Sequence, residues 1–121
     1  MKNWLFNFQG IYYALAGIWP VFDIHSFMIV TGPKADIWLV KTVGLLSFSI
    51  GLSLLSLKKY RIAPVLNALS AMSFLLIDVY YASIDRISDV YLGDAILELT
   101  FLLGAIIIFV RHPDDLKSRF E

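Results

Sequence analysis

The chain contains no cysteine among its 121 residues. That absence excludes disulfide bonds, thiolate nucleophiles and cysteine-ligated metal sites, and with them the four-helix membrane oxidoreductases that work through cysteine pairs. The chain also lacks an excess of positive charge, because its ten Lys and Arg are balanced by ten Asp and Glu. Proteins that bind nucleic acid normally present a basic face, so we expect no nucleic-acid partner.

Histidine is scarce as well, with only two in the chain. His25 falls in a predicted loop and His112 at the end of a predicted helix. Neither is placed in mid-membrane, so the two are not expected to hold a haem between helices. Asp23 and His25 are too few ligands for a zinc site. We therefore expect no metal and no cofactor.

Apolar residues are what the chain has in excess: 59% of its residues are hydrophobic, and its mean hydropathy is +0.74. Soluble domains are about half apolar, so most of the apolar surface of this chain must face lipid. Four runs reach or approach the roughly 20 apolar residues that cross a bilayer. The runs are continuous rather than alternating, which favours helices over a β-barrel. We predict an all-α fold in which residues 1–121 form one integral membrane domain, an antiparallel bundle of four transmembrane helices at 5–22, 37–57, 62–84 and 90–110.

The first run is the shortest and most polar, and the sequence leaves open whether it spans fully. No small-residue cleavage site follows it, so it is predicted to be a retained helix rather than a signal peptide. Residues 23–35 are predicted to be a loop with a Gly32-Pro33 turn. Asp36 is expected to cap the next helix. Tight turns at 58–61 and 85–89 favour up-and-down topology, and residues 111–121 are expected to form a charged amphipathic tail.

The basic residues indicate an orientation. If both termini are cytoplasmic, seven Lys and Arg fall on the cytoplasmic side against three on the outer side, as the positive-inside rule requires. We predict a multi-pass protein of the cell (inner) membrane, with the lipid bilayer as its surroundings. The inner residues are Lys2, Lys58, Lys59, Arg61, Arg111, Lys117 and Arg119, and the outer ones are Lys34, Lys41 and Arg86.

Four ionisable residues lie within the predicted spans, namely Lys41, Asp78, Asp94 and Glu98. Each charge costs about 2.5–3.5 kcal/mol at the centre of a membrane helix, so these side chains should face inward and find partners. Lys41 is expected to pair with Asp78 or Glu98. Tyr81 shares a helix face with Asp78 and is the expected wall of a pocket. These residues predict an outward-facing polar pocket for a ligand or ion, or alternatively an internal salt bridge that sets helix register.

Small residues recur along two predicted helices at the spacing of small-x-x-x-small faces, which let helices approach closely. Such faces serve either packing within the bundle or a homodimer, and the sequence does not choose between them. They are Gly10, Ala14 and Gly17 in the first helix, and Gly44, Ser47 and Gly51 in the second.

The first half of the chain carries the pattern W-P, H-S-F, T-G-P-K, D-x-W-L-V-K-T-V-G. In this it resembles a family of small bacterial four-helix integral membrane proteins of uncharacterised activity. The resemblance implies the architecture and an outer-loop site, but no chemistry. Small multidrug-resistance exporters are similar in size, but they carry a membrane-embedded Glu in the first helix, which this chain lacks. The positions that match the pattern are Trp19, Pro20, His25, Ser26, Thr31, Gly32, Pro33, Lys34, Asp36, Trp38, Lys41 and Thr42.

Three functions are compatible with this sequence. The first is a non-enzymatic membrane protein that binds or conducts a small solute or ion through the polar pocket, with the segment from His25 to Asp36 covering it. The second is a structural or accessory subunit that packs against larger membrane partners. The third is a small enzyme acting on a lipid, with Asp78 and Glu98 as acid and base. It ranks last, because no nucleophile, metal or cofactor motif supports it.

Overall fold

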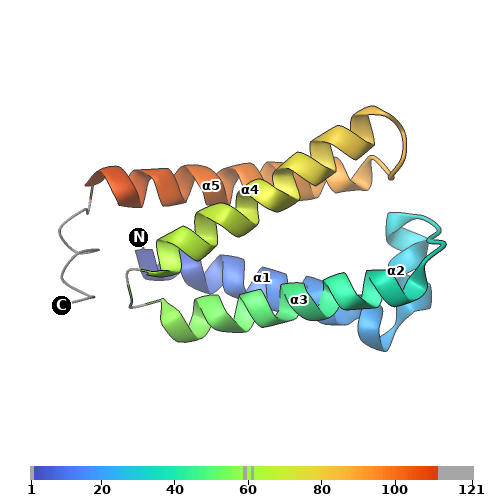
Figure 1. The fold of residues 1–121 in the computed structure, drawn as a ribbon, viewed down its shortest axis with the longest axis horizontal. Helices are drawn as coiled ribbons and strands as arrows, with labels where there is room; N and C mark the ends of the chain where they lie inside the picture. The colour runs from blue at the N-terminus through green and yellow to red at the C-terminus, as the bar shows by residue number, and fades with distance from the viewer. Residues whose placement is uncertain (1, 59, 61, 112–121) are drawn as a thin grey trace.

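The computed structural model describes residues 2–58, 60 and 62–111, and within them it contains helices and no strand. The predicted tail after Arg111 lies outside the described residues, as do His112 and four of the basic residues used for the orientation, Lys59, Arg61, Lys117 and Arg119. The helices are α1 (Lys2–Phe22), α2 (Ile24–Thr31), α3 (Ile37–Leu57), α4 (Ile62–Ser83) and α5 (Val90–Arg111) (Figure 1). The all-α prediction is confirmed.

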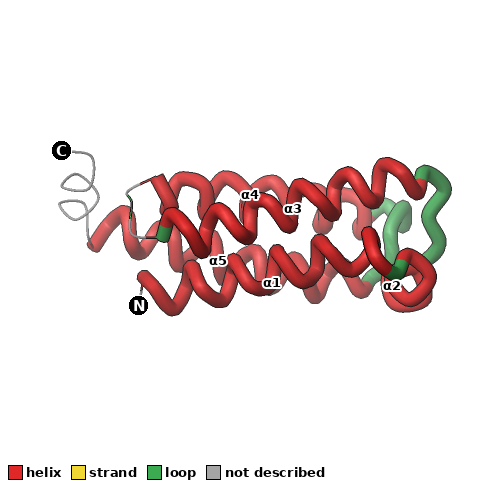
Figure 2. Tube along the Cα trace, turned by 90° about the horizontal axis from the view of Figure 1, so that it is seen from below, coloured by secondary structure: helices red, strands yellow, loops and turns green. Residues whose placement is uncertain are grey.

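The four long helices lie alongside one another and alternate in direction along the chain (Figures 1 and 2). α1 begins and α5 ends at the same end of the bundle, while α2 lies at the opposite end. By length and hydropathy α3, α4 and α5 can each cross a membrane, whereas α1 passes that test only together with α2, from which it is bent by 115°. The apolar helices, three or up to four of them long enough to span, indicate a multi-pass membrane protein.

The prediction of a loop over residues 23–35 is wrong, because α2 occupies Ile24–Thr31. Asp23 begins this helix, its carboxylate accepting a hydrogen bond from the backbone N–H of Ser26 at 3.2 Å. The Ser26 hydroxyl in turn accepts a bond from the indole N–H of Trp19 at 2.7 Å, which ties α2 to the end of α1. Gly32 ends the helix with a φ of 100°, a conformation that favours glycine. The sequence analysis interpreted the polar residues of this segment as a loop, whereas Asp23 and Ser26 form the cap of a short helix.

Asp36 stands at the N-terminus of α3, as predicted, but its side chain makes no capping hydrogen bond. Its backbone carbonyl accepts instead from the N–H groups of Leu39 and Val40, each at 3.1 Å. The prediction of the position was therefore right and the prediction of the capping bond was wrong.

Small residues bring the backbones of α1 and α3 into direct contact. A Cβ atom added at Gly17 would lie 2.6 Å from the backbone nitrogen of Phe48, and one added at Gly51 would lie 2.6 Å from that of Ala14. Between these contacts the Ser47 hydroxyl donates to the Tyr13 carbonyl at 3.0 Å. The small-residue faces thus pack against each other inside the chain.

The core and the surface have the distribution expected of a bundle in lipid. Large apolar side chains are exposed along the outside, among them Leu15 (65%), Trp38 (70%) and Ile96 (68%). Such exposure would be costly in water but is favourable in hydrocarbon. The buried apolar cluster comprises Leu5, Phe6, Tyr13, Leu54, Ala63, Ala71, Phe101 and Ile108.

The α1–α3 contact predicts that Gly17→Ala destabilises the protein. The added methyl group forces two backbones apart, so we expect the free energy of unfolding to fall by about 1–3 kcal/mol, the usual range for overpacking. Unfolding in mild detergent, followed by circular dichroism, measures this. Gly93→Ala is the control, because a Cβ atom there meets nothing within 4 Å. Equal stability of the two variants would contradict the close approach.

Candidate functional site

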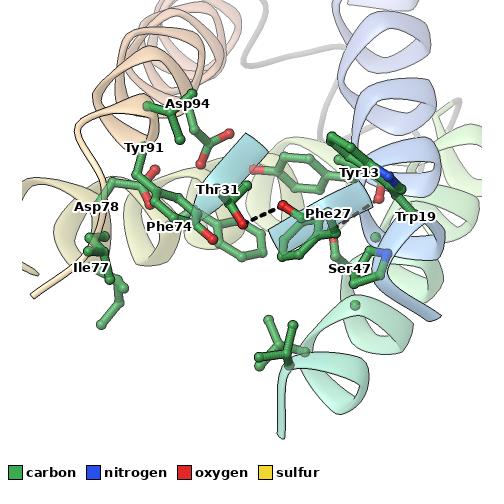
Figure 3. A pocket seen from close by; sticks show the side chains of 18 of the residues that line it. Tyr13, Trp19, Phe27, Thr31, Ser47, Phe74, Ile77, Asp78, Tyr91 and Asp94 are labelled. Atoms are coloured by element: carbon green, nitrogen blue, oxygen red, sulfur yellow. Dashed lines mark hydrogen bonds between the residues drawn. The ribbon is translucent and has the colours of Figure 1, made fainter. Parts of the chain in front are cut away.

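A cavity of about 830 Å³ lies between the α1–α3 pair and the α4–α5 pair, at the end of the bundle that α2 covers (Figure 3). Figure 3 shows Asp78, Asp94 and Tyr91 on its α4–α5 side, with Trp19 and Ser47 across from them. Most of its wall is apolar or aromatic. The aromatic residues that line it are Tyr12, Tyr13, Trp19, Phe27, Phe74 and Tyr91.

Three carboxyl groups line the cavity, Asp78 from α4 and Asp94 and Glu98 from α5. Asp94 and Glu98 are one turn apart on α5 and therefore project from the same face. Two consecutive tyrosines of α1 meet them, because the Tyr12 hydroxyl donates to Asp94 and the Tyr13 hydroxyl donates to Glu98. Hydrogen bonds across the bundle hold these two carboxyl groups in place.

A further polar contact lies one turn along α1, away from α2. The side-chain amide of Gln9 donates to the backbone carbonyl of Asn67 at 3.3 Å, and the Asn67 amide donates back to the Gln9 oxygen. Both residues are fully buried. The sequence analysis described the first apolar run as the most polar and did not single out Gln9. The signal that it missed was the spacing of Gln9, Tyr12 and Tyr13, which places them on one helix face.

Asp78 differs from the other two carboxyl groups. Its side chain is only 4% exposed, yet one carboxyl oxygen, Oδ2, has no hydrogen-bond partner within the described part of the chain. Buried polar atoms are satisfied in the great majority of cases, and each exception calls for an explanation. Asp78 is one of the residues that line the cavity.

Among the described residues, the positively charged residue that lines the cavity is Lys34, whereas Lys41, which the sequence analysis placed there, does not line it. The Lys34 ammonium donates to the carbonyls of Thr31 and Gly32 at 3.1 and 3.0 Å and lies 5.2 Å from the centre of the Tyr91 ring. Burial lowers the pKa of Lys34 below its ordinary value. Within the described residues, Lys41 makes no ion pair with Asp78 or Glu98 and is absent from the cavity wall.

The rotation of α3 explains the position of Lys41. This helix turns Val40, Val43 and Ser47 toward the cavity, at the spacing of one helix face. Lys41 follows Val40 by one residue, a rotation of about 100° around the helix axis, and so lies off that face. The sequence could predict how far along its helix Lys41 lies, but it could not predict the direction in which the Lys41 side chain points.

Tyr81 is also outside the cavity, contrary to the prediction. It is 38% exposed, and its ring packs edge-on against Tyr80 with the ring centres 5.0 Å apart. The buried face of α4 continues from Asp78 to Ala82, four residues on, which leaves Tyr81 beside that face.

The predicted outer-loop residues divide into two groups. Trp19, Thr31 and Lys34 line the cavity, and the Thr31 hydroxyl donates to the Phe27 carbonyl at 2.8 Å. His25 and Asp36 are exposed and do not line it.

The cavity reaches the lipid-facing surface between α3 and α4. Leu39, Val43 and Ile77 all line it and are nevertheless 46%, 47% and 54% exposed. The two helices diverge toward the α2 end of the bundle (Figure 1). A molecule dissolved in the membrane would therefore meet the cavity from the side.

Comparison with known proteins assigns no family to this chain. No protein-family model matches it, and neither a curated protein nor a solved structure matches it. The resemblance described for the first half of the chain stays a prediction.

The tyrosine–carboxyl contacts predict that Tyr13→Phe destabilises the bundle. The substitution removes the hydroxyl that donates to the fully buried Glu98, and we expect a loss of about 1–3 kcal/mol in the free energy of unfolding. Tyr80→Phe, at an exposed position on α4, is the control and should change it little. In a double-mutant cycle, Tyr13→Phe and Glu98→Gln should be non-additive. Additive effects would mean that the two side chains do not interact in the membrane.

Proposed function

We propose that this chain is a four-span protein of the cell membrane, with both termini in the cytoplasm, that binds a small solute in the cavity at its outer end. The length of α1 supports four spans. Its 21 residues extend about 31 Å, comparable to the roughly 30 Å of hydrocarbon in a bilayer. On this proposal α2 lies at the outer surface and covers the cavity.

The observation that carries the proposed function is the unpartnered oxygen of Asp78 in the cavity. An ionisable group within a membrane span is expensive and marks a functional site by default. The alternative of a purely structural subunit accounts for Asp94 and Glu98, which receive hydrogen bonds from α1. It does not account for Asp78, since a structural bundle gains nothing from a buried carboxyl oxygen that has no hydrogen-bond partner within the described residues.

Topology can be tested because the chain has no cysteine to give background labelling. Ser88, in the turn between α4 and α5, and Ser56, near the end of α3, are both exposed and lie at opposite ends of the bundle. We expect a membrane-impermeant maleimide to label Ser88→Cys in intact cells and Ser56→Cys only after lysis. The reverse pattern would invert the proposed orientation.

Solute binding can be tested by native mass spectrometry of the protein purified in mild detergent. We expect a small molecule to co-purify with the wild type and to be lost from Asp78→Asn. The matched control is Asp85→Asn, which removes the same charge outside the cavity, at a φ of 58° that asparagine adopts readily. If no small molecule co-purifies, or if the same one co-purifies with the wild type and both variants, the alternative of a structural subunit is favoured.

A further inference from the structure

The balance of charge in the cavity indicates what kind of solute fits it. Three carboxyl groups face it, Asp78, Asp94 and Glu98, against the single ammonium group of Lys34. The hydroxyl groups that bind Asp94 and Glu98 belong to tyrosines and contribute no positive charge. Within the described residues none of the three carboxyl groups forms an ion pair.

Within the described residues Lys34 forms no ion pair with the carboxyl groups, because its ammonium group is directed elsewhere. It donates to two backbone carbonyls at the end of α2 and lies near the rings of Phe27 and Tyr91, 5.9 and 5.2 Å from their centres. The cavity thus has an excess of acidic groups on its α4–α5 side, where Asp78 Oδ2 lacks a partner.

The shape and lining of the cavity argue against a bare metal ion. In the part of the chain that the structure describes, no three His, Asp or Glu side chains are arranged to hold a metal. A volume of about 830 Å³ accommodates an organic molecule. Aromatic rings such as those of Phe74 and Tyr91 can pack against an apolar body and attract a positive charge to their faces.

The exposed apolar residues at the opening favour a solute that partitions into lipid. Leu39, Val43 and Ile77 form a side entrance without a charged residue among them. A strongly hydrated ion would gain nothing at this entrance, whereas an amphiphile already in the bilayer could pass through it.

We propose that the ligand of the cavity is a hydrophobic organic cation, which enters from the lipid between α3 and α4 and places its positive charge at Asp78. This inference rests on the proposed solute-binding function and specifies the class of ligand. Asp94 and Glu98, held by tyrosines, supply the surrounding negative field, while the aromatic wall holds the apolar body.

Tetraphenylphosphonium and tetraphenylborate provide the test, because they share size and shape and differ in the sign of their charge. Equilibrium dialysis against the full chain in lipid nanodiscs measures binding, with empty nanodiscs giving the partition into lipid. We expect saturable binding of the phosphonium alone. Asp78→Asn should weaken it by about tenfold or more, as for the loss of one good ionic contact, whereas Asp85→Asn should leave it within about twofold, a limit of about 0.4 kcal/mol.

A second variant keeps the test valid if Asp78→Asn fails to fold, which circular dichroism and gel filtration would reveal. Val43→Trp enlarges a side chain of the cavity wall, where the larger ring takes up volume that the ligand needs, and it leaves every charge in place. We expect it, too, to weaken phosphonium binding.

The outcomes separate the ligand class from the function. Saturable binding of the borate that Val43→Trp abolishes would overturn the cation proposal and leave solute binding intact. Saturable binding of neither probe would also overturn the cation proposal, while the co-purified molecule seen by mass spectrometry decides on solute binding independently. Phosphonium binding that is equal in all three proteins, wild type, Asp78→Asn and Val43→Trp, would place the probe elsewhere and refute the site.

Discussion

The hydrogen bonds along one face of α1 are the interaction on which the rest of this structure depends. Gln9, Tyr12 and Tyr13 each reach across to the α4–α5 pair, where their partners are Asn67, Asp94 and Glu98. Lipid gives helices no hydrophobic reason to associate, so packing and interhelical hydrogen bonds must hold a membrane bundle together. These contacts join two helix pairs that diverge toward the α2 end of the bundle (Figure 1), and they set the depth at which the cavity begins.

α1 serves three environments at once, which explains why it is the least apolar of the long helices. One face carries the glycines that contact α3, and a second carries the hydrogen-bonding residues. A third, with Trp4, Phe8, Ile11 and Leu15 at helical spacing, is exposed to lipid. Glycines and hydrogen-bonding residues thus occupy positions of α1 that a peripheral helix would fill with large apolar side chains. Its modest hydropathy reflects a central position in the bundle and not a peripheral one.

Sequence reasoning succeeded for features that a local sequence pattern determines. It failed for features that depend on how a helix is rotated about its own axis. The continuous apolar run at 37–57 predicted α3 because length and hydropathy suffice for a span. The shared face of Asp94 and Glu98 followed from spacing alone. Lys41 and Tyr81 were misplaced because the direction of a side chain depends on how its helix packs, which spacing within that helix does not reveal. α2 was missed because Asp23 and Ser26 suit both a loop and a helix cap.

The position of the Gln9–Asn67 contact bears on whether a solute could pass through the protein. Both side chains are fully buried, and they lie on the side of Tyr13 and Glu98 that faces away from α2. Leu54, Phe101 and Ile108 are buried in the core that extends toward that end of the bundle. The cavity is therefore covered by α2 at one end, flanked by exposed residues of α3 and α4 at its side, and closed at its other end by these buried side chains. The proposed binding would use the cavity as it stands, whereas conduction would require the hydrogen bonds of α1 to break, the same bonds that hold the two helix pairs together.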